Sequence, residues 1–564
     1  GEIYNYKEIK RQLENKNYKF KNNSDSEIIP AAFRCWGINF INKLNGMFAI
    51  SIYDRANKKI YLIRDRVGVK PLYYSRFSNK ILFASELKGI TNYPDFLKKV
   101  NYKALYSYLA FRYPSDGKNI FFKNIFRIEP GCYLEIDLKT YDFKEKMYWE
   151  IPQIKEDQSM KEQFCQEKLI HLLNESVEKH LISDVPVGVL LSGGLDSSLL
   201  SAIASEKVDK KIQTFSVSFN EKKYDESKKA KKVADYIGSQ HLNVKINRDN
   251  FYENLVNIIN VKDAPISIPH EYPLYFLSKE IKKKVKVVLS GEGADEFFGG
   301  YSRVQKSPFD YKKSNLLGNL SNKKLFKKLF SIDENFNFKN KYFSDFFFHR
   351  YNWFKFGEIE DVLNDDIVKQ INPEEIKEPW LKIIKSNKDN SLYNQTLNLF
   401  QKNHLQCLLD RLDIHTMAHS VEARVPFLDH NLIEFINTVP FKFKIKWKSK
   451  FHKWKSIFSN SESFSEKNDI NKYLLRKVGA KYLPPDVAKE KKLGFPLPMN
   501  DWMRDERVKE ILLEQRTINR NIFKKDKIEK LFLDYNFKKD PYDFSGKKIW
   551  MILNIELWMR SNFD

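Results

Sequence analysis

A glycine-rich turn follows a buried apolar run in residues 185–198, which read Val-Pro-Val-Gly-Val-Leu-Leu-Ser-Gly-Gly-Leu-Asp-Ser-Ser. Gly193 and Gly194 allow the backbone to turn tightly and let an anion approach the peptide N–H groups. Ser192 and Ser197 add hydroxyl donors, and the N-terminus of the helix expected to follow adds partial positive charge. The chemistry predicted for this turn is the binding of a phosphate chain.

This turn differs from a Walker loop, which requires the pattern G-x-x-x-x-G-K-[S/T] with a lysine that reaches the terminal phosphates. Asp196 stands in this turn and a lysine is absent from it. A carboxylate there suits a site in which Mg²⁺ bridges the protein and phosphate oxygens. The pattern Ser-Gly-Gly-Leu-Asp-Ser-Ser resembles the loop of ATP pyrophosphatases, which cleave ATP between its α- and β-phosphates. The other interpretation is an ordinary strand–helix turn.

A second glycine-rich turn, residues 290–301, reads Ser-Gly-Glu-Gly-Ala-Asp-Glu-Phe-Phe-Gly-Gly-Tyr after another apolar run. It places Glu292, Asp295 and Glu296 within a few residues of one another. Three packed carboxylates would repel each other unless they share a cation. With Asp196 contributed by the first turn, a Mg²⁺–pyrophosphate complex explains both turns. The alternative is a solvated acidic turn.

Two later segments are ambiguous when taken alone. Residues 412–429 predict a helix followed by a buried pairing of arginine with carboxylates. Lys472 and Arg476 are spaced i and i+4, which is typical of a solvated helix face. Neither segment defines a ligand by itself.

The first 140 residues are rich in short strand-like runs, among them 47–53, 59–64 and 80–84, separated by turn residues. The first two predict a hairpin, so this part is expected to be mostly antiparallel, with helices at 6–13 and 26–36. A polar stretch that contains Pro152 predicts a linker.

After the linker the pattern becomes strand, helix, strand, helix. The apolar runs are 185–191, 214–219, 242–246 and 285–289, and from about residue 300 the chain is predicted to be mostly helical. This alternation predicts a parallel sheet covered on both faces, with the chemistry at the carboxyl ends of its strands.

The composition excludes several classes of protein. The 564 residues exceed one compact core, and the chain has 42% hydrophobic residues without any run long enough to span a membrane. The start of the chain has no signal-peptide pattern, and the four scattered cysteines (Cys35, Cys132, Cys165 and Cys407) argue against disulfide scaffolding and structural zinc. A reducing cytoplasm, with no membrane partner, is the expected location.

The net charge of +24 suggests nucleic-acid binding. The lysines are spread along the chain, however, so no nucleic-acid partner is expected. In residues 441–455 aromatic and basic residues alternate, as in single-strand binders. A half-buried strand or hairpin with a solvated lysine face is the favoured interpretation.

Taken in order, these residues are similar over essentially the whole chain to glutamine-dependent asparagine synthetases of the bacterial B type. Further matching segments are Gly1–Asn5, Ser24–Glu27, Leu44–Ala49, Arg64–Tyr74, Phe83–Lys88, Pro130–Gly131, Lys491–Phe495, Pro498 and Trp502. The resemblance implies an incomplete α+β glutaminase domain of the N-terminal-nucleophile fold with antiparallel sheets (1–145) and a linker (146–165). An α/β ATP-pyrophosphatase domain with a parallel sheet and a helical C-terminal part (166–564) would follow.

The resemblance also implies the activity: ATP and aspartate form β-aspartyl-AMP, and ammonia from glutamine then displaces AMP. Glu292 matches the carboxylate tied to formation of the intermediate and to ammonia attack, and Lys472 the cation over the reacting phosphorus. The implied ATP contacts are Leu190, Ser192, Gly193, Gly194, Asp196, Ser197, Val217, Ser290 and Gly291. The implied Mg²⁺ ligands are Asp196 and Asp295, and the implied glutamine contacts are Gly1, Glu2 and Asp25. The oligomeric state stays open, with a homodimer as one option.

The departure from the family is at the start. The nucleophilic cysteine of the family would precede Gly1, so the chain is expected to be a fragment without glutaminase activity. A related adenylating amidotransferase or a β-lactam-type synthetase acting on another carboxylate is the main alternative. A non-catalytic remnant and a tRNA-modifying pyrophosphatase explain fewer of the motifs.

Overall fold

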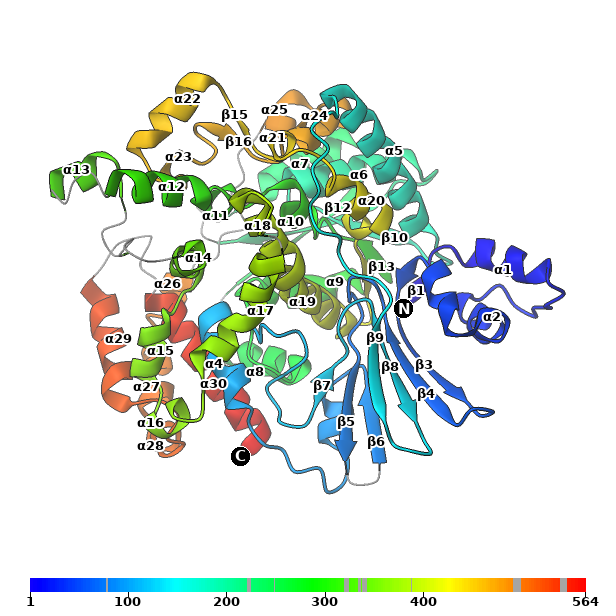
Figure 1. Cartoon of the computed structure of the whole chain (residues 1–564), viewed down its shortest axis with the longest axis horizontal. Coiled ribbons are helices and arrows are strands. Elements are labelled where there is room, and N and C mark those ends of the chain that lie inside the picture. The colour runs from blue at the N-terminus through cyan, green and yellow to red at the C-terminus, as the bar shows by residue number, and fades with distance from the viewer. Residues whose placement is uncertain are drawn as a thin grey trace.

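A computed structural model describes residues 1–77, 80–220, 225–247, 249–318, 324–332, 336, 342–386, 388–489, 499–537 and 545–564. The chain forms an antiparallel N-terminal half followed by a half built on a parallel sheet, and helices occupy most of the rest (Figure 1). The predicted succession of an antiparallel and a parallel part is therefore confirmed. The motif at 491–495, Pro498 and the turn at 78–79 lie outside the described residues.

The N-terminal half contains two antiparallel sheets. One has the order β3 (Ala49–Asp54), β4 (Lys59–Arg64), β8 (Cys132–Asp137) and β9 (Phe143–Met147). The other has the order β6 (Lys80–Ala84), β5 (Tyr73–Phe77) and β7 (Phe126–Arg127). The predicted hairpin is the β3–β4 pair, in which Ala49 lies opposite Arg64.

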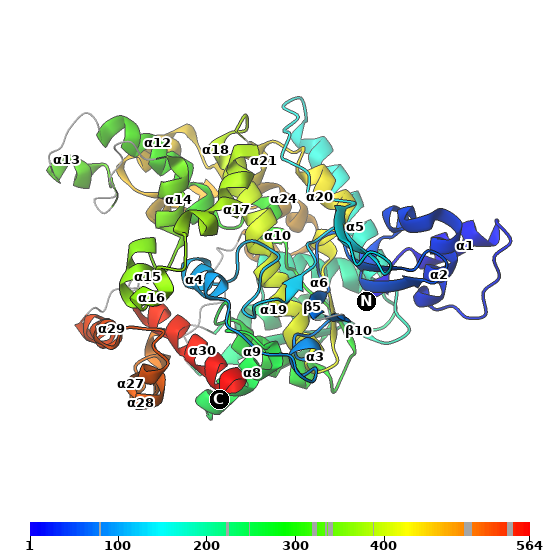
Figure 2. The same ribbon diagram turned by 60° about the horizontal axis from the view of Figure 1, so that its bottom comes forward.

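Two helices of this half project at one end of the molecule in both ribbon views (Figures 1 and 2). They are α1 (Tyr6–Glu14) and α2 (Ile28–Trp36), close to the predicted helices. Beside them the two-residue strand β1 (Glu2–Ile3) pairs with β2 (Gly46–Met47). The start of the chain is thereby tied to the edge of the N-terminal half.

The second half is built on a five-stranded parallel sheet with the order β12, β11, β10, β13, β14. Its strands are β10 (Val187–Leu190), β11 (Gln213–Phe219), β12 (Gln240–Ile246), β13 (Val287–Leu289) and β14 (Glu422–Arg424). From β10 the chain proceeds outward to β11 and β12 and then returns to β13 on the other side. The sheet therefore has its switch point between β10 and β13, where ligands of open α/β sheets bind.

Helices pack against this sheet, among them α6 (Leu195–Glu206), α7 (Ser227–Tyr236), α9 (Glu271–Ile281) and α19 (Leu405–Met417). The four apolar runs predicted as strands are strands. The fifth strand, β14, was not predicted, because residues 412–429 were interpreted as a helix and a buried ion pair. It is a three-residue strand, and the sheet neighbour β13 defines it through the pairing of Leu289 with Arg424.

The alternation at 441–455 does not form one strand or hairpin over its length, so that prediction is wrong for most of the segment. The segment forms α21 (Phe441–Lys444), the two-residue strand β15 (Lys446–Trp447) and α22 (Lys450–Lys455). Lys444 is fully buried, whereas Phe451 and Trp454 are exposed. A regular solvated lysine face therefore does not exist here, because period-two spacing over a few residues also fits short helical turns.

Buried ion pairs and one large apolar core join the two halves. Lys70 lies 2.6 Å from Asp413, and Arg127 lies 2.5 Å from Asp410, with both cationic side chains largely buried. The main hydrophobic cluster contains residues from both halves, including Tyr108 and Val189. The predicted linker 146–165 overlaps the end of β9 and the start of α5 (Glu162–Leu181). Its central part, residues 148–161, lacks helix and strand but packs closely, since Ile154 is fully buried.

The C-terminal helix α30 (Ser545–Phe563) packs against α8 (Phe251–Lys262) and α4 (Tyr102–Phe111) (Figure 1). Within the described part of the chain, none of the helices combines the length and apolar character needed to span a bilayer.

Candidate active site

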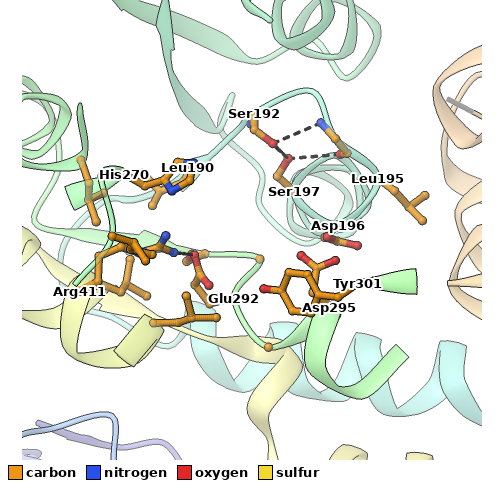
Figure 3. Close-up of a pocket in the computed structure, with 18 of the residues that line it drawn as sticks. Leu190, Ser192, Leu195, Asp196, Ser197, His270, Glu292, Asp295, Tyr301 and Arg411 are labelled. Atoms are coloured by element: carbon orange, nitrogen blue, oxygen red, sulfur yellow. Dashed lines mark hydrogen bonds and ion pairs between the residues drawn. The ribbon is translucent and has the colours of Figure 1, made fainter. Parts of the chain in front are cut away.

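A cavity of about 710 Å³ lies at the switch point of the parallel sheet (Figure 3). The loops after β10 and β13 form two of its walls, because these strands are neighbours and end at the same edge. All the residues that the sequence predicted for ATP, metal and catalysis line this cavity: Leu190, Ser192, Gly193, Gly194, Asp196, Ser197, Val217, Ser290, Gly291, Glu292, Asp295 and Lys472. The structure thus brings together residues that are as much as 282 positions apart in the chain, from Leu190 to Lys472.

The loop after β10 is held by hydrogen bonds of its own. Gly193 has φ +77°, and a Cβ there would lie 2.6 Å from the backbone nitrogen of Ala230, so only glycine fits. The backbone N–H of Ser192 donates to Ser197 Oγ at 3.1 Å, and the two hydroxyls lie 3.0 Å apart. Helix α6 begins at Leu195, directly after the turn. The loop therefore presents hydroxyls and a helix N-terminus to the cavity, a favourable setting for an anion.

Asp196 and Asp295 point toward each other from the two loops (Figure 3). The Nζ of Lys472 contacts both, forming an ion pair with Asp196 Oδ2 and lying 2.6 Å from Asp295 Oδ1. Burial alone would lower the pKa of Lys472, but the two carboxylates outweigh it and raise the pKa. Because one ammonium group satisfies both carboxylates, these carboxylates are close enough to share a cation.

The same pair of carboxylates fits Mg²⁺, which prefers carboxylate oxygens and phosphate oxygens as ligands. Lys472 supplies positive charge beside the same two carboxylates that a shared metal ion would use as ligands. The donor set of Asp196 and Asp295 is therefore chemically compatible with the predicted metal.

The backbone around Lys472 is held in an unusual conformation. Lys472 has φ +49°, in the left-handed region that costs energy for a residue with a Cβ, and it directly precedes α24 (Tyr473–Tyr482). Arg476 donates from Nε to the carbonyl of Asn471 at 2.9 Å and from Nη2 to the Asn471 side chain at 2.8 Å. The i, i+4 spacing therefore does not mark a solvated face: Arg476 fixes the turn that aims Lys472 into the cavity.

The three carboxylates of the second loop do not converge on one cation. Asp295 pairs with Lys472, and Glu292 accepts a hydrogen bond from Arg411 Nη2. Glu296 is buried, and Tyr301 Oη donates to it at 2.7 Å. Burial, together with the charges of Asp295 and Glu292, raises the pKa of Glu296 to about 8. Lys472 and Arg411 thus each balance one of these carboxylates, and the raised pKa of Glu296 favours its protonated form.

Several residues of the cavity wall were not predicted as site residues, above all Arg411, Tyr301 and His270. Arg411 lies on α19, on a helix without a recognisable ligand motif. Just before α19 a π-helical segment, Phe400–His404, places both of its end residues on the cavity wall. Such segments are frequent at functional sites. They depend on backbone geometry, so no local sequence pattern marks this π-helical segment.

The loop that carries His270 is positioned by a buried network. Glu271 accepts hydrogen bonds from Lys262 Nζ at 2.9 Å and from the backbone of Ser267 at 2.7 Å, and it lies 2.7 Å from His415 Nε2. Burial alone would raise the pKa of Glu271, but Lys262 and His415 outweigh it and lower the pKa to about 2. The ionised carboxylate therefore anchors this wall of the cavity from behind.

The residues predicted to bind glutamine lie together but away from the cavity. Glu2 Oε2 lies 3.0 Å from Arg424 Nη2, and Asp25 Oδ2 accepts a hydrogen bond from the backbone of Ile3 at 3.0 Å. Burial and the nearby Asp25 raise the pKa of Glu2 against the opposing effect of Arg424. Gly1 packs closely against the backbone of Met47 and Phe48. Their predicted role stays a prediction.

Fold and site together define an α/β protein whose two carboxylate-bearing loops meet at the switch point of a parallel sheet. Residues 168–560 match the family described as asparagine synthase, and residues 1–149 match the family described as glutamine amidotransferase domain. The chain belongs to the asparagine synthase family.

Individual relatives agree with the family match. Asparagine synthetase [glutamine-hydrolyzing] 1 of Bacillus subtilis is 30% identical over 584 aligned residues, covering 100% of this chain and 85% of that protein. A putative glutamine-hydrolyzing asparagine synthetase of Mycobacterium tuberculosis is 28% identical and covers 89% of this chain and 75% of its own. The solved glutamine phosphoribosylpyrophosphate amidotransferase of Bacillus subtilis covers 43% of each chain at 14% identity. Its TM-score is 0.18, too low for a comparison of folds.

Proposed function

We propose that the protein catalyses the ATP-dependent amidation of L-aspartate to L-asparagine, with glutamine as the nitrogen donor. The reaction runs through β-aspartyl-AMP and releases AMP and pyrophosphate. The observation that carries this proposal is the meeting of Asp196, Asp295 and Lys472 between two glycine-rich loops of one cavity. Family membership supplies the acceptor and the donor, and the glutamine-hydrolyzing asparagine synthetases among the relatives do not favour the alternative adenylating synthetases.

In this proposal the first loop binds pyrophosphate. Ser192, Ser197 and the backbone of Gly193 and Gly194 donate hydrogen bonds to its oxygens, helped by the N-terminus of α6. The ends of the strands hold the rest of the nucleotide, with Leu190, Val217, Ser290 and Gly291 as contacts of the adenosine part. ATP would then lie across the switch point, with its phosphates toward Asp196.

Asp196 and Asp295 would hold Mg²⁺, which neutralises phosphate charge when it is bound. Lys472 is already placed between these carboxylates and would contact the phosphate oxygens. A cation fixed at that point stabilises the negative charge that develops as the carboxylate attacks the α-phosphorus. Pyrophosphate leaves with the electrons of the broken P–O bond, and the β-carboxylate becomes a mixed anhydride with AMP, from whose acyl carbon ammonia then displaces AMP as the leaving group.

Glu292 would assist formation of the intermediate and the attack by ammonia, which must arrive unprotonated. Its ion pair with Arg411 places the carboxylate at the cavity wall. Water that reached the adenylate would hydrolyse it, so the cavity must be closed during turnover.

The N-terminal half would bind glutamine through Gly1, Glu2 and Asp25, as an N-terminal-nucleophile glutaminase. The boundaries at 145 and 165, the cytoplasmic location and a homodimer are part of the same proposal and stay predictions.

The test is pyrophosphate release by the purified protein with ATP, Mg²⁺, ammonium and a panel of carboxylates. Ammonium makes the assay independent of the amidotransferase half. Aspartate should give pyrophosphate and asparagine at a rate well above that of glutamate and succinate. If another acid supports pyrophosphate release and aspartate does not, the proposed acceptor is wrong.

A further inference from the structure

In the roles above, Arg411 has one task, which is to hold Glu292 at the cavity wall. It lies on α19 and lines the cavity, and its Nη2 donates to Glu292 Oε1 (Figure 3). Its side chain is 12% exposed. Burial alone would lower the pKa of Arg411, but Glu292 and Tyr301 raise it. A charged guanidinium is therefore part of the wall of the cavity in which the acceptor of the proposed reaction would bind.

The protein does not use the full hydrogen-bonding capacity of this guanidinium. Arginine has five N–H donors in a planar fork that fits a carboxylate with two parallel bonds. In the described part of the chain, Nε of Arg411 is buried without a hydrogen-bond partner. Leaving a buried donor unsatisfied costs free energy, so a ligand that engages this edge of the fork gains stabilisation that the empty cavity lacks.

The order of charges along the cavity fits an α-amino acid with a carboxylate in its side chain. Asp196 and Asp295 mark the phosphate end, and Glu292 lies between them and Arg411 (Figure 3). A reacting side-chain carboxylate has to face the phosphate end. An α-ammonium group would then lie near Glu292, and an α-carboxylate would lie near Arg411.

We propose that Arg411 binds the α-carboxylate of the acceptor, while Glu292 turns to the α-ammonium group. This inference rests on the proposed function and names the residue that selects its substrate. The amino acid inserts its own pair of charges into the Arg411–Glu292 ion pair, so every buried charge keeps a partner. An acceptor that lacks one of the two charges would leave Arg411 or Glu292 without a partner. An unpaired charge in a buried site costs free energy, so such an acceptor should bind more weakly.

The experiment compares aspartate with β-alanine, which has the same reacting carboxylate and ammonium group but no α-carboxylate. Arg411→Gln removes the charge and the fork, and Arg411→Lys keeps the charge and removes the fork. Arg507→Gln is the matched control, because Arg507 is exposed and pairs with Glu253 outside the cavity. The readouts are pyrophosphate release with ammonium, KM for each acceptor, and KM for ATP.

In Arg411→Gln we expect KM for aspartate to rise about a hundredfold, on the scale of a lost charge-assisted pair. KM for ATP should change less than about threefold, because the phosphate end is untouched. The preference for aspartate over β-alanine, as the ratio of their kcat/KM values, should fall at least about tenfold in Arg411→Gln and less in Arg411→Lys.

A purely structural role for Arg411 would lower kcat or thermal stability and leave this ratio unchanged. An unchanged ratio in both variants, with Arg507→Gln behaving as the wild type, would overturn the inference. Failure of the wild-type protein to use aspartate at all would instead count against the proposed function, so the two outcomes are distinguishable.

Discussion

The two loops of the cavity follow neighbouring parallel strands, yet they are stabilised in different ways. Each turns at a glycine with positive φ, Gly193 at +77° and Gly293 at +92°, and each leads into a helix. The loop after β10 is held by the hydroxyls and amides of its own Ser192 and Ser197. The loop after β13 carries carboxylates that are held by Lys472 and Arg411 from distant parts of the chain.

The difference concerns where the stabilising groups come from. The first loop is built from local hydrogen bonds, so its shape should survive changes elsewhere in the cavity. The carboxylates of the second loop depend on cations that a bound nucleotide or acceptor can compete for. The first loop therefore acts as a fixed cradle except at Asp196, which shares Lys472 with Asp295. The second loop is the part of the cavity whose charges respond most to ligands.

The largest expected effect joins the two loops. Asp196→Asn and Asp295→Asn should each reduce pyrophosphate release at least about a hundredfold, because each removes half of a shared cation site. The double variant should lose little more than either single variant, since the two carboxylates act as a unit. Asp209→Asn, at an exposed carboxylate, is the control. Additive losses in the double variant would show that the carboxylates work separately.

A substitution in the second loop alone tests its packing. A Cβ at Gly300 would lie 1.6 Å from Asp295 Oδ1 and 2.4 Å from Lys472 Cε. Gly300→Ala should therefore displace both charged groups and reduce pyrophosphate release about thirtyfold or more, with the fold retained. Gly357→Ala is a matched control, because a Cβ there meets nothing within 4 Å. Equal activity of the two variants would contradict the close contact of Asp295 and Lys472 around Gly300.

The local origin of the first loop also explains what the sequence could predict. Glycine-rich turns after apolar runs are short-range signals, and both turns lie at the ends of the predicted strands. By contrast, β14 is only three residues long and pairs with β13, which is distant in the sequence. At the end of this pairing the backbone N–H of Ser290 donates to the carbonyl of Arg424. Its strand character comes from that pairing, which no local pattern encodes.

The partners of the second loop were predicted only in part for the same reason. Lys472 was found through the family resemblance, whereas Arg411 lies on a helix whose sequence offers no motif. The alternation at 441–455 misled the prediction because Lys444 is buried while Phe451 is exposed. Whether a lysine is buried depends on tertiary packing, so the alternation of residue types in the sequence does not predict it.

A smaller effect is expected within the first loop. Ser197→Ala removes the acceptor of the Ser192 N–H and one hydroxyl of the cradle. KM for ATP should rise about three- to tenfold, the scale of one or two neutral hydrogen bonds, with a smaller change in kcat. Ser205→Ala, at the other end of α6, removes a hydroxyl that donates to the Ala202 carbonyl at 2.8 Å and should leave KM unchanged. A hundredfold rise in KM for ATP in Ser197→Ala would mean that the remaining hydrogen bonds of this loop cannot hold its shape without Ser197.

The smallest effect concerns the stability of the second loop and its dependence on pH. The pKa of Glu296 is raised to about 8 in the folded protein by burial and by Asp295 and Glu292, against about 4.5 when the chain is unfolded. Between these values the folded state binds more protons than the unfolded state, so the free energy of unfolding falls as pH rises through this window. Glu296→Gln keeps an acceptor for Tyr301 and removes the titration, so its thermal midpoint should exceed that of the wild type by about 2 °C or more at pH 8 and converge with it near pH 5.

Thermal unfolding monitored from pH 5 to 9 measures this difference, with the exposed Glu206→Gln as control. Parallel curves for wild type and Glu296→Gln would show that Glu296 is ionised in the folded protein, and repulsion in this loop would then require a cation beyond Lys472 and Arg411.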